Sequence, residues 1–112
     1  MKIILAEVTS GKNSSELAFD KGSVLIGRDA SVCDIVFDGA TFPMVSRRHA
    51  ELAWAGGSWT IRDLGSSYGT YVDGRRVHES AVINAGSRIQ VGAEGPGVVV
   101  IWFEVGSEAV AV

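Results

Sequence analysis

The chain alternates short apolar runs with polar or glycine-rich breaks, and no stretch keeps apolar residues at helical spacing for three turns. The runs are about four to eight residues long and rich in Val and Ile, which is typical of β-strands. The pattern predicts strands over 2–8, 15–19, 23–28, 34–37, 50–53, 58–63, 70–72, 75–77, 88–91 and 97–105. Many short strands separated by turns favour an all-β sandwich.

Two of the breaks have the sequence of a β-hairpin turn. Gly56-Gly57 and Asp73-Gly74 each separate two predicted strands, and both dipeptides tolerate the positive φ angles of a two-residue hairpin. Trp54 and Trp59 flank the first turn. We expect these two rings to pack against each other across the strand pair.

The length of 112 residues is that of one domain. Apolar residues make up 46% of the chain, enough for a core, and a charged fraction of 21% argues against wholesale disorder. The last apolar run, 97–105, predicts a strand that is covered on both faces or closes the core. We expect a single domain over 1–105 and a frayed tail at 106–112. Such a domain can also be part of a larger protein.

The formal net charge of −3 narrows the classes of partner. Nucleic-acid binding requires a broadly basic face, whereas an acidic chain binds an anion only through a local arginine cluster.

Cys33 is the only cysteine, so no intrachain disulfide can form, which fits a reducing, cytoplasmic compartment. The first apolar run is too short for a signal peptide and is interrupted by Glu7, and no run reaches the ~18 residues of a membrane helix, so we expect no membrane contact. Cys33, His49 and His78 lack metal-ligand spacing, so we expect no metal, and we expect no cofactor.

Several arginines fall at predicted strand ends or in loops: Arg28, Arg47, Arg48, Arg75 and Arg76. Loops at one end of a sandwich can gather such side chains onto one surface. The planar guanidinium matches phosphate oxygens in bidentate fashion, and a phosphorylated side chain carries roughly −1.5 to −2 charges. Arginines beside hydroxyl groups are therefore suited to a phosphate site, although many surface arginines simply face solvent.

Ser46-Arg47-Arg48-His49 places a hydroxyl, two cations and an imidazole just before a predicted strand. A hydrolase interpretation, with His49 activating Ser46, is disfavoured because the segment lacks the G-x-S-x-G elbow. In an extended segment the two side chains also point to opposite faces. We expect instead that Ser46 acts from the loop while His49 turns inward and hydrogen-bonds backbone.

In the stretch 63–70, Gly65 and Gly69 bracket Ser66, Ser67 and Tyr68 between two predicted strands. Glycines permit backbone shapes that aim N–H groups and small hydroxyls at an anion. The stretch is not a nucleotide-binding P-loop, because it lacks the G-x-x-x-x-G-K-[ST] pattern. An ordinary polar loop is the alternative.

Taken together, these features resemble the forkhead-associated (FHA) family over nearly the whole chain, from about 17 to 103. The matching stretches are Leu25-Ile26-Gly27-Arg28, Cys33-Asp34-Ile35-Val36, Ser46-Arg47-Arg48-His49-Ala50, Asp63-Leu64-Gly65-Ser66-Ser67, Gly69-Thr70-Tyr71-Val72 and Asp73-Gly74. Their order and spacing are together highly specific.

The resemblance implies a β-sandwich of about eleven strands in two sheets with binding loops at one end. It implies a non-catalytic signalling module that binds a phosphothreonine-containing protein segment, the product of a Ser/Thr kinase. By this likeness Arg28 grips the phosphate, Ser46 hydrogen-bonds a phosphate oxygen, and Arg47 contacts phosphate or peptide backbone. Ser67 supplies a hydroxyl that closes the pocket.

The same resemblance implies supporting roles for residues beside the pocket. Gly27 lets the loop approach closely, and His49 ties the Ser46 loop to the loop around Gly65, which ends at Gly69. Asp73-Gly74 shapes a hairpin outside the pocket.

This sequence departs from the family pattern at two places. Tyr68 stands where the family usually has an asparagine that holds the bound peptide, and a phenol cannot both donate and accept as a short amide does. The stretch 38–45 is longer than usual and carries Phe42 and Met44, which either contact a partner or fold back over the end of the sandwich. Both departures motivate an alternative function, a phosphate-independent interaction domain or scaffold that keeps the FHA fold.

Overall fold

The alternating pattern produces strands throughout the computed structural model, which describes residues 2–8 and 15–104. Within these ranges there are eleven strands and no helix, so none that could cross a membrane. The strands are β1 (Lys2–Val8), β2 (Glu16–Asp20), β3 (Ser23–Gly27), β4 (Ile35–Val36), β5 (Ala50–Ala55), β6 (Ser58–Asp63), β7 (Thr70–Val72), β8 (Arg75–Arg76), β9 (Ser80–Val82), β10 (Arg88–Val91) and β11 (Gly97–Phe103).

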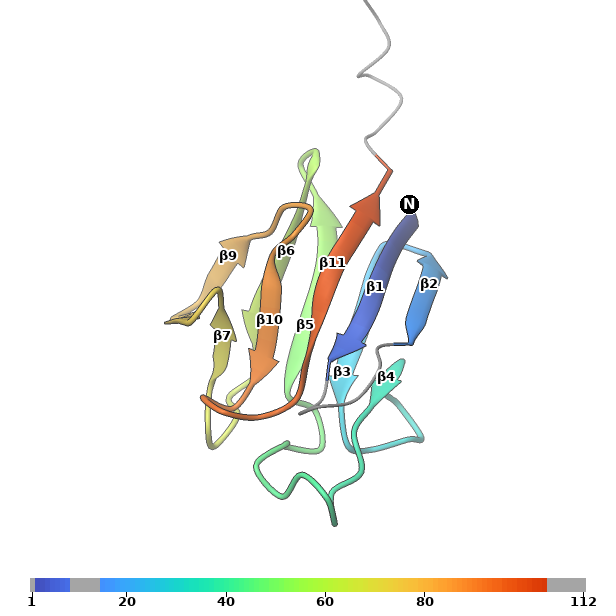
Figure 1. Cartoon of the computed structure of the whole chain (residues 1–112). Coiled ribbons are helices and arrows are strands. Elements are labelled where there is room, and N and C mark those ends of the chain that lie inside the picture. The colour runs from blue at the N-terminus through green and yellow to red at the C-terminus, as the bar shows by residue number, and fades with distance from the viewer. Residues whose placement is uncertain (1, 9–14, 105–112) are drawn as a thin grey trace, which may run out of the picture.

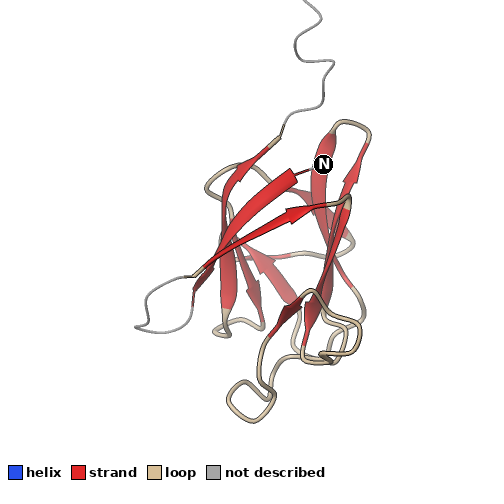
Figure 2. Ribbon diagram, turned by 90° about the vertical axis from the view of Figure 1, so that its right-hand side faces the viewer, coloured by secondary structure: helices blue, strands red, loops and turns tan. Residues whose placement is uncertain are grey.

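The described strands form two sheets that pack face to face (Figures 1 and 2). One sheet has the order β2-β1-β11-β10-β7-β8, and the other has the order β4-β3-β5-β6-β9. All strand pairs are antiparallel except β3 with β4. The prediction of an all-β sandwich of about eleven strands is confirmed.

The core lies between the sheets and is built from alternate residues of the longer strands. Ile3 and Leu5 face inward from β1, and Leu52 and Ile61 face them from the other sheet, all fully buried. Trp59 is also fully buried, and its ring meets that of Trp54 edge-on, with centroids 5.9 Å apart. The expected packing of the two tryptophans across β5 and β6 is confirmed.

Both predicted hairpins have the expected geometry. Gly56 and Gly57 have φ angles of 62° and 86°, and Asp73 and Gly74 have φ angles of 51° and 83°. Two consecutive positive φ angles match the right-handed twist of the flanking strands. Asp73 tolerates this conformation, and its Oδ1 also accepts a hydrogen bond of 3.0 Å from the backbone N–H of Arg88, which ties the hairpin to β10.

The structure corrects the sequence prediction in two strands. β9 was not predicted, because three residues with one half-buried side chain leave too little alternation to detect. Of the two alternatives for 97–105, coverage on both faces is wrong for the second half, where Ile101 and Trp102 are 45% and 47% exposed, whereas Val98 and Val100 lie in the core. The register of β1 with β11 shifts between Ile4 and Leu5, beside these exposed residues. The predicted tail at 106–112 lies outside the described residues.

The loops that follow β3, β4, β6 and β10 gather at one end of the sandwich, opposite the N-terminus (Figure 1). β3, β6 and β10 end there, and β5, β7 and β11 begin there. Segments distant in sequence, such as 28–34, 37–49 and 64–69, are thereby brought to a single surface.

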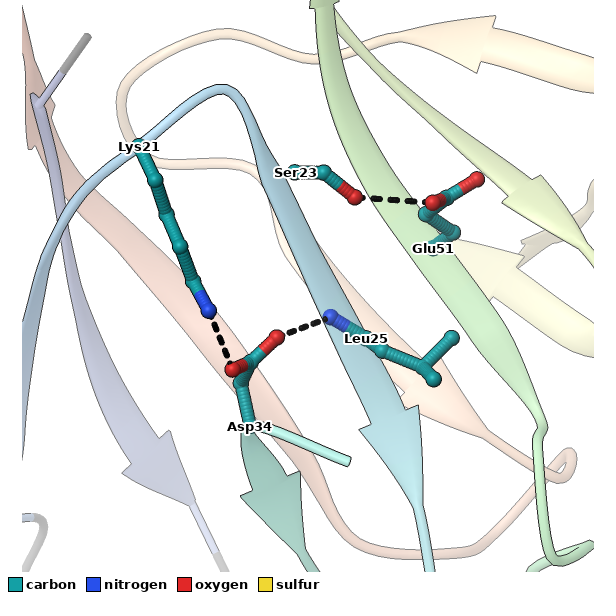
Figure 3. Close-up of polar contacts among 5 residues, drawn as sticks. All are labelled: Lys21, Ser23, Leu25, Asp34 and Glu51. Carbon is teal, nitrogen blue, oxygen red and sulfur yellow. Dashed lines mark hydrogen bonds and ion pairs between the residues drawn. The ribbon is translucent and has the colours of Figure 1, made fainter. Parts of the chain in front are cut away.

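Asp34 fixes the start of the parallel pair at the sheet edge (Figure 3). Its N–H donates to the carbonyl of Leu25, its Oδ2 accepts the N–H of Leu25 at 2.9 Å, and its Oδ1 pairs with Lys21. Burial alone would raise the pKa of Asp34, but the Leu25 N–H and the Lys21 ammonium outweigh it and lower the pKa. The carboxylate thus takes the place of a backbone acceptor beside β3.

We predict that Asp34→Ala lowers the free energy of unfolding by about 1–2 kcal/mol, because it removes a charge-assisted hydrogen bond and leaves the Leu25 N–H without that partner. Urea denaturation measures the loss. The control is Ser23→Ala, which removes only the exposed hydrogen bond to Glu51 and should cost less than about 0.5 kcal/mol. Equal effects of the two substitutions would contradict the role given to Asp34.

Candidate functional site

The end of β3 lies in direct backbone contact with the segment before β5. A Cβ added at Gly27 would lie 2.2 Å from the carbonyl oxygen of Arg47 and 2.9 Å from Cys33 Sγ, so only glycine fits there. The same Arg47 carbonyl accepts the Asp29 N–H at 3.2 Å and the Cys33 thiol at 3.2 Å. Gly27 therefore permits the close approach of these two backbone segments.

Arg28 is held beside Ser46 by its own backbone and side chain. Its N–H donates to the Ser46 carbonyl at 3.1 Å, and its Nε donates to the Val45 carbonyl at 2.9 Å. Gly39 leaves room for the aliphatic part of the side chain, because a Cβ there would lie 2.9 Å from Arg28 Cδ. The guanidinium is exposed, and among the described residues its Nη groups have no hydrogen-bond partner. These donors are therefore free to bind an anion at a fixed position.

His49 is fully buried, and both of its ring nitrogens are used. Nδ1 accepts the Ser46 N–H at 3.1 Å, so Nε2 carries the hydrogen and donates to the Gly69 carbonyl at 2.7 Å. Burial lowers the pKa of His49, although the Gly69 carbonyl and the charge of Asp63 oppose that shift. The neutral ring joins the two loops as expected, with its contact at Gly69 rather than Gly65.

Asp63 organises the loop between β6 and β7, a role that the sequence interpretation missed. Its Oδ2 accepts the N–H groups of Gly65 and Ser66, each at 3.0 Å, and its Oδ1 accepts the hydroxyls of Ser66 and Thr70. Burial would raise the pKa of Asp63, but these donors outweigh it and lower the pKa. An Asp followed two residues later by Gly and three later by Ser is the signature of an Asx turn, and could have revealed the role.

The predicted pocket residues from the two segments come together at Ser46. The Ser67 N–H lies 3.4 Å from Ser46 Oγ, although the residues are 21 positions apart. Ser46 also lines a hollow with Asp29, Arg47 and Arg48, which we call the Ser46 hollow. Arg28 lies beside this hollow rather than in its lining. The structure thus brings four of the five predicted binding residues, Arg28, Ser46, Arg47 and Ser67, to one place.

Arg48 belongs to the Ser46 hollow but was not among the predicted binding residues. Its neighbour Asp29 brings a carboxylate to the same hollow, turned toward the N–H and hydroxyl of Ser31. These two hydrogen bonds lower the pKa of Asp29, with smaller contributions from Arg48 and Arg47. Two cations therefore face one carboxylate whose acceptors are partly occupied, and the hollow retains positive charge.

Tyr68, the fifth predicted binding residue, follows Ser67 in the chain, and its side chain is 60% exposed to solvent. Its Cβ lies 3.8 Å from the position of an added Cβ on Gly92, and Met44 Cγ lies 2.8 Å from the same position. Met44 and Phe42 are half-buried against the core, and the Phe42 ring meets that of Phe37 edge-on at 6.0 Å. The interpretation that Phe42 and Met44 fold back over the end of the sandwich is confirmed.

The arrangement is suited to anion binding. It presents the free guanidinium donors of Arg28 and the hydroxyl of Ser46, whose oxygen already accepts the Ser67 N–H, on one surface. The ring of His49 cannot serve as the base for Ser46, because both of its nitrogens already bond backbone groups. Across residues 2–8 and 15–104, no three His, Cys, Asp or Glu side chains are grouped to hold a metal ion.

Comparison with known proteins identifies the family. The FHA domain model matches residues 24–92, so the chain belongs to the FHA domain family. The glycogen accumulation regulator GarA of Mycolicibacterium smegmatis is 39% identical over 89 residues, 79% of this chain and 53% of that protein. The oxoglutarate dehydrogenase inhibitor of Corynebacterium diphtheriae is 37% identical over 86 residues, 76% of this chain and 57% of that protein.

A solved structure of similar fold is that of Mycobacterium tuberculosis EmbR in complex with a low-affinity phosphopeptide. It superposes with a TM-score of 0.71 and 26% identity, covering 94% of this chain and 26% of that one. The chain spans about half the length of the curated relatives that it matches. The chain contains an FHA domain, a module of signalling interactions.

We predict that Gly27→Ala destabilises the domain by about 1–3 kcal/mol, because the new methyl group would displace the Arg47 backbone. Urea denaturation measures the change. Gly22→Ala is the matched control, since a Cβ there would meet only Trp54 Cβ, at 4.0 Å, and its cost should stay below about 0.5 kcal/mol. If Gly27→Ala proved as stable as Gly22→Ala, the close contact would not constrain the fold.

We predict that acidification destabilises the domain through His49. Its pKa is lowered on folding, so the unfolded chain binds more protons once the pH falls below the ordinary value of about 6.5. The free energy of unfolding should be flat above that pH and fall below it, by at most about 1.4 kcal/mol per pH unit. Urea denaturation at a series of pH values tests this.

His78→Gln, which removes the other histidine, should keep the slope. His49→Gln should be less stable at neutral pH and lack the slope between pH 6.5 and 5. A flat profile for the parent protein over that range would contradict a buried neutral His49.

Proposed function

We propose that this FHA domain binds protein segments that contain phosphothreonine, as a non-catalytic reader of Ser/Thr kinase products. The observation that carries the proposal is the fixed guanidinium of Arg28. Its Nε is bound to the Val45 carbonyl and its backbone N–H to the Ser46 carbonyl, so the side chain that carries the remaining donors is held next to the Ser46 segment. Because these donors are already ordered before the anion arrives, binding does not carry the entropic cost of ordering them.

The charge of the surface supports a phosphate rather than a carboxylate ligand. Arg28, Arg47 and Arg48 lie around Ser46, and the Asp29 carboxylate offsets only part of their charge. A phosphate carries more negative charge and offers three acceptor oxygens, so it can engage more than one arginine and the Ser46 hydroxyl together. The solved complex of EmbR with a phosphopeptide supports the same assignment by likeness.

A second candidate function is phosphate-independent binding of a partner protein on the same fold. The exposed phenol of Tyr68 motivates it, because this ring can contact a partner through packing rather than by holding its backbone. The names of two relatives, a regulator of glycogen accumulation and an inhibitor of oxoglutarate dehydrogenase, describe control of metabolism. The two candidates differ in whether Arg28 is required.

We predict that the purified domain binds a degenerate phosphothreonine peptide library and does not bind the matching unphosphorylated library. Arg28→Ala should weaken binding by about 10- to 100-fold, the loss expected for charge-assisted hydrogen bonds of about 1.5–3 kcal/mol. Fluorescence anisotropy or calorimetry at physiological salt measures the dissociation constants. Arg75→Ala, which removes the same charge from β8, should change affinity less than about twofold, as expected for screened surface charges.

Phosphopeptide binding that survives Arg28→Ala would overturn the role of this arginine. Binding to both libraries alike would favour the phosphate-independent candidate.

A further inference from the structure

Arg76 covers the loop that carries the Ser67 N–H, although it comes from a different strand. A Cβ added at Gly69 would lie 3.0 Å from Arg76 Nε, 3.2 Å from Cζ and 3.4 Å from Nη2. Because these three guanidinium atoms lie at nearly equal distances from that position, the face of the planar group covers the side of Gly69 where a side chain would stand. Gly69 is buried beneath it, with a φ angle of 84° that favours glycine.

The position of Arg76 is set by strand pairing rather than by the loop. Arg76 pairs with Tyr71 in the register of β7 and β8, and the next residue, Val77, donates its N–H to the Thr70 carbonyl at 2.8 Å. The Gly69 carbonyl in turn accepts from the His49 ring and from the Gly92 N–H. The guanidinium therefore rests on backbone that is bonded to both sheets, and it belongs to the same rigid unit as Ser46.

Arg76 has free hydrogen-bonding capacity. Its side chain is exposed, and within residues 2–8 and 15–104 no carboxylate forms an ion pair with it. Asp73 and Glu79 line a hollow with Arg76, but the Asp73 carboxylate accepts the Arg88 N–H instead. A guanidinium that stacks through its face keeps its N–H donors at the rim, where they can bind an anion in the plane of the group.

One bound segment can span the distance between the proposed phosphate position at Ser46 and the guanidinium of Arg76. Consecutive Cα atoms lie about 3.8 Å apart, so the guanidinium lies at most about 17 Å from Ser46 Oγ along the path through Ser67 and Gly69. An extended segment advances about 3.3 Å per residue. A side chain within about five residues of the phosphothreonine can therefore reach Arg76.

Resting on the proposed function, we infer that Arg76 is a specificity residue that binds an anionic side chain flanking the phosphothreonine. The ligand group is a carboxylate of Asp or Glu or a second phosphoryl group, both of which accept from a guanidinium in bidentate fashion. A phosphothreonine segment with such a flanking group would engage two arginine sites, at Arg28 and at Arg76. Segments with lysine at that position would be selected against.

The test uses phosphothreonine peptides in which each of the five positions on either side carries, in turn, Glu, a second phosphothreonine, Ala or Lys. The parent domain should bind at least one acidic or diphosphorylated series about 3- to 10-fold more tightly than the Ala series, as expected for a partly exposed charge pair. Arg76→Gln should abolish that preference and leave the affinity for the Ala series nearly unchanged. Arg75→Gln, a matched loss of charge on the same strand, should retain the preference.

The comparison of peptide series separates recognition from a structural effect. If Arg76 only supported the Gly69 backbone, Arg76→Gln would weaken the Glu and Ala series equally, and that result would overturn the inference. A parent domain with no acidic preference, or equal effects of Arg76→Gln and Arg75→Gln, would also overturn it while the proposed function stands. Absence of binding to every phosphopeptide would instead overturn the proposed function, and the inference with it. Peptides with Glu and with a second phosphothreonine distinguish the two sources of negative charge.

Discussion

The buried imidazole of His49 joins the two loops on which the candidate site depends. It stands at the start of β5 in one sheet, accepts the Ser46 N–H, and donates to the carbonyl of Gly69, just before β7 in the other sheet. A neutral ring with both nitrogens satisfied carries little cost of burial, whereas an unpaired polar group there would be expensive. This side chain therefore links the segment that carries the Ser46 hydroxyl to the loop that carries the Ser67 N–H.

Two further contacts complete the support of the site, and each uses a different kind of constraint. Gly27 acts by the absence of a side chain, which lets the Arg47 carbonyl approach the end of β3. Asp63 acts by charge, because its carboxylate gathers four donors from the following loop. Together they hold exposed arginines on a backbone that has little freedom to move, so that the binding side chains project from a preorganised frame.

The charge distribution explains how an acidic chain can present an anion site. The net charge is −3, yet among the described residues no carboxylate forms an ion pair with Arg28 or Arg76, and the nearby carboxylates of Asp29 and Asp73 accept other hydrogen bonds. The carboxylates of Asp29, Asp34 and Asp63 accept hydrogen bonds from backbone, hydroxyl or ammonium donors, and the pKa of each is lowered. The carboxylates thus stabilise loops and strand edges, and the guanidinium groups of Arg28 and Arg76 remain available to a ligand.

Local features of the sequence were enough to predict most of the strands and turns. Alternation predicted ten of the described strands, and the Gly56-Gly57 and Asp73-Gly74 turns followed from their tolerance of positive φ. The resemblance of the ordered motifs to the FHA family indicated Arg28, Ser46, Arg47 and Ser67. Contacts between distant segments became visible only in the folded chain. These were the pairing of His49 with Gly69, the donors gathered by Asp63, the short strand β9, and the position of Arg76 over Gly69. No spacing along one strand encodes such contacts, because they arise only when two sheets fix several loops at the same end.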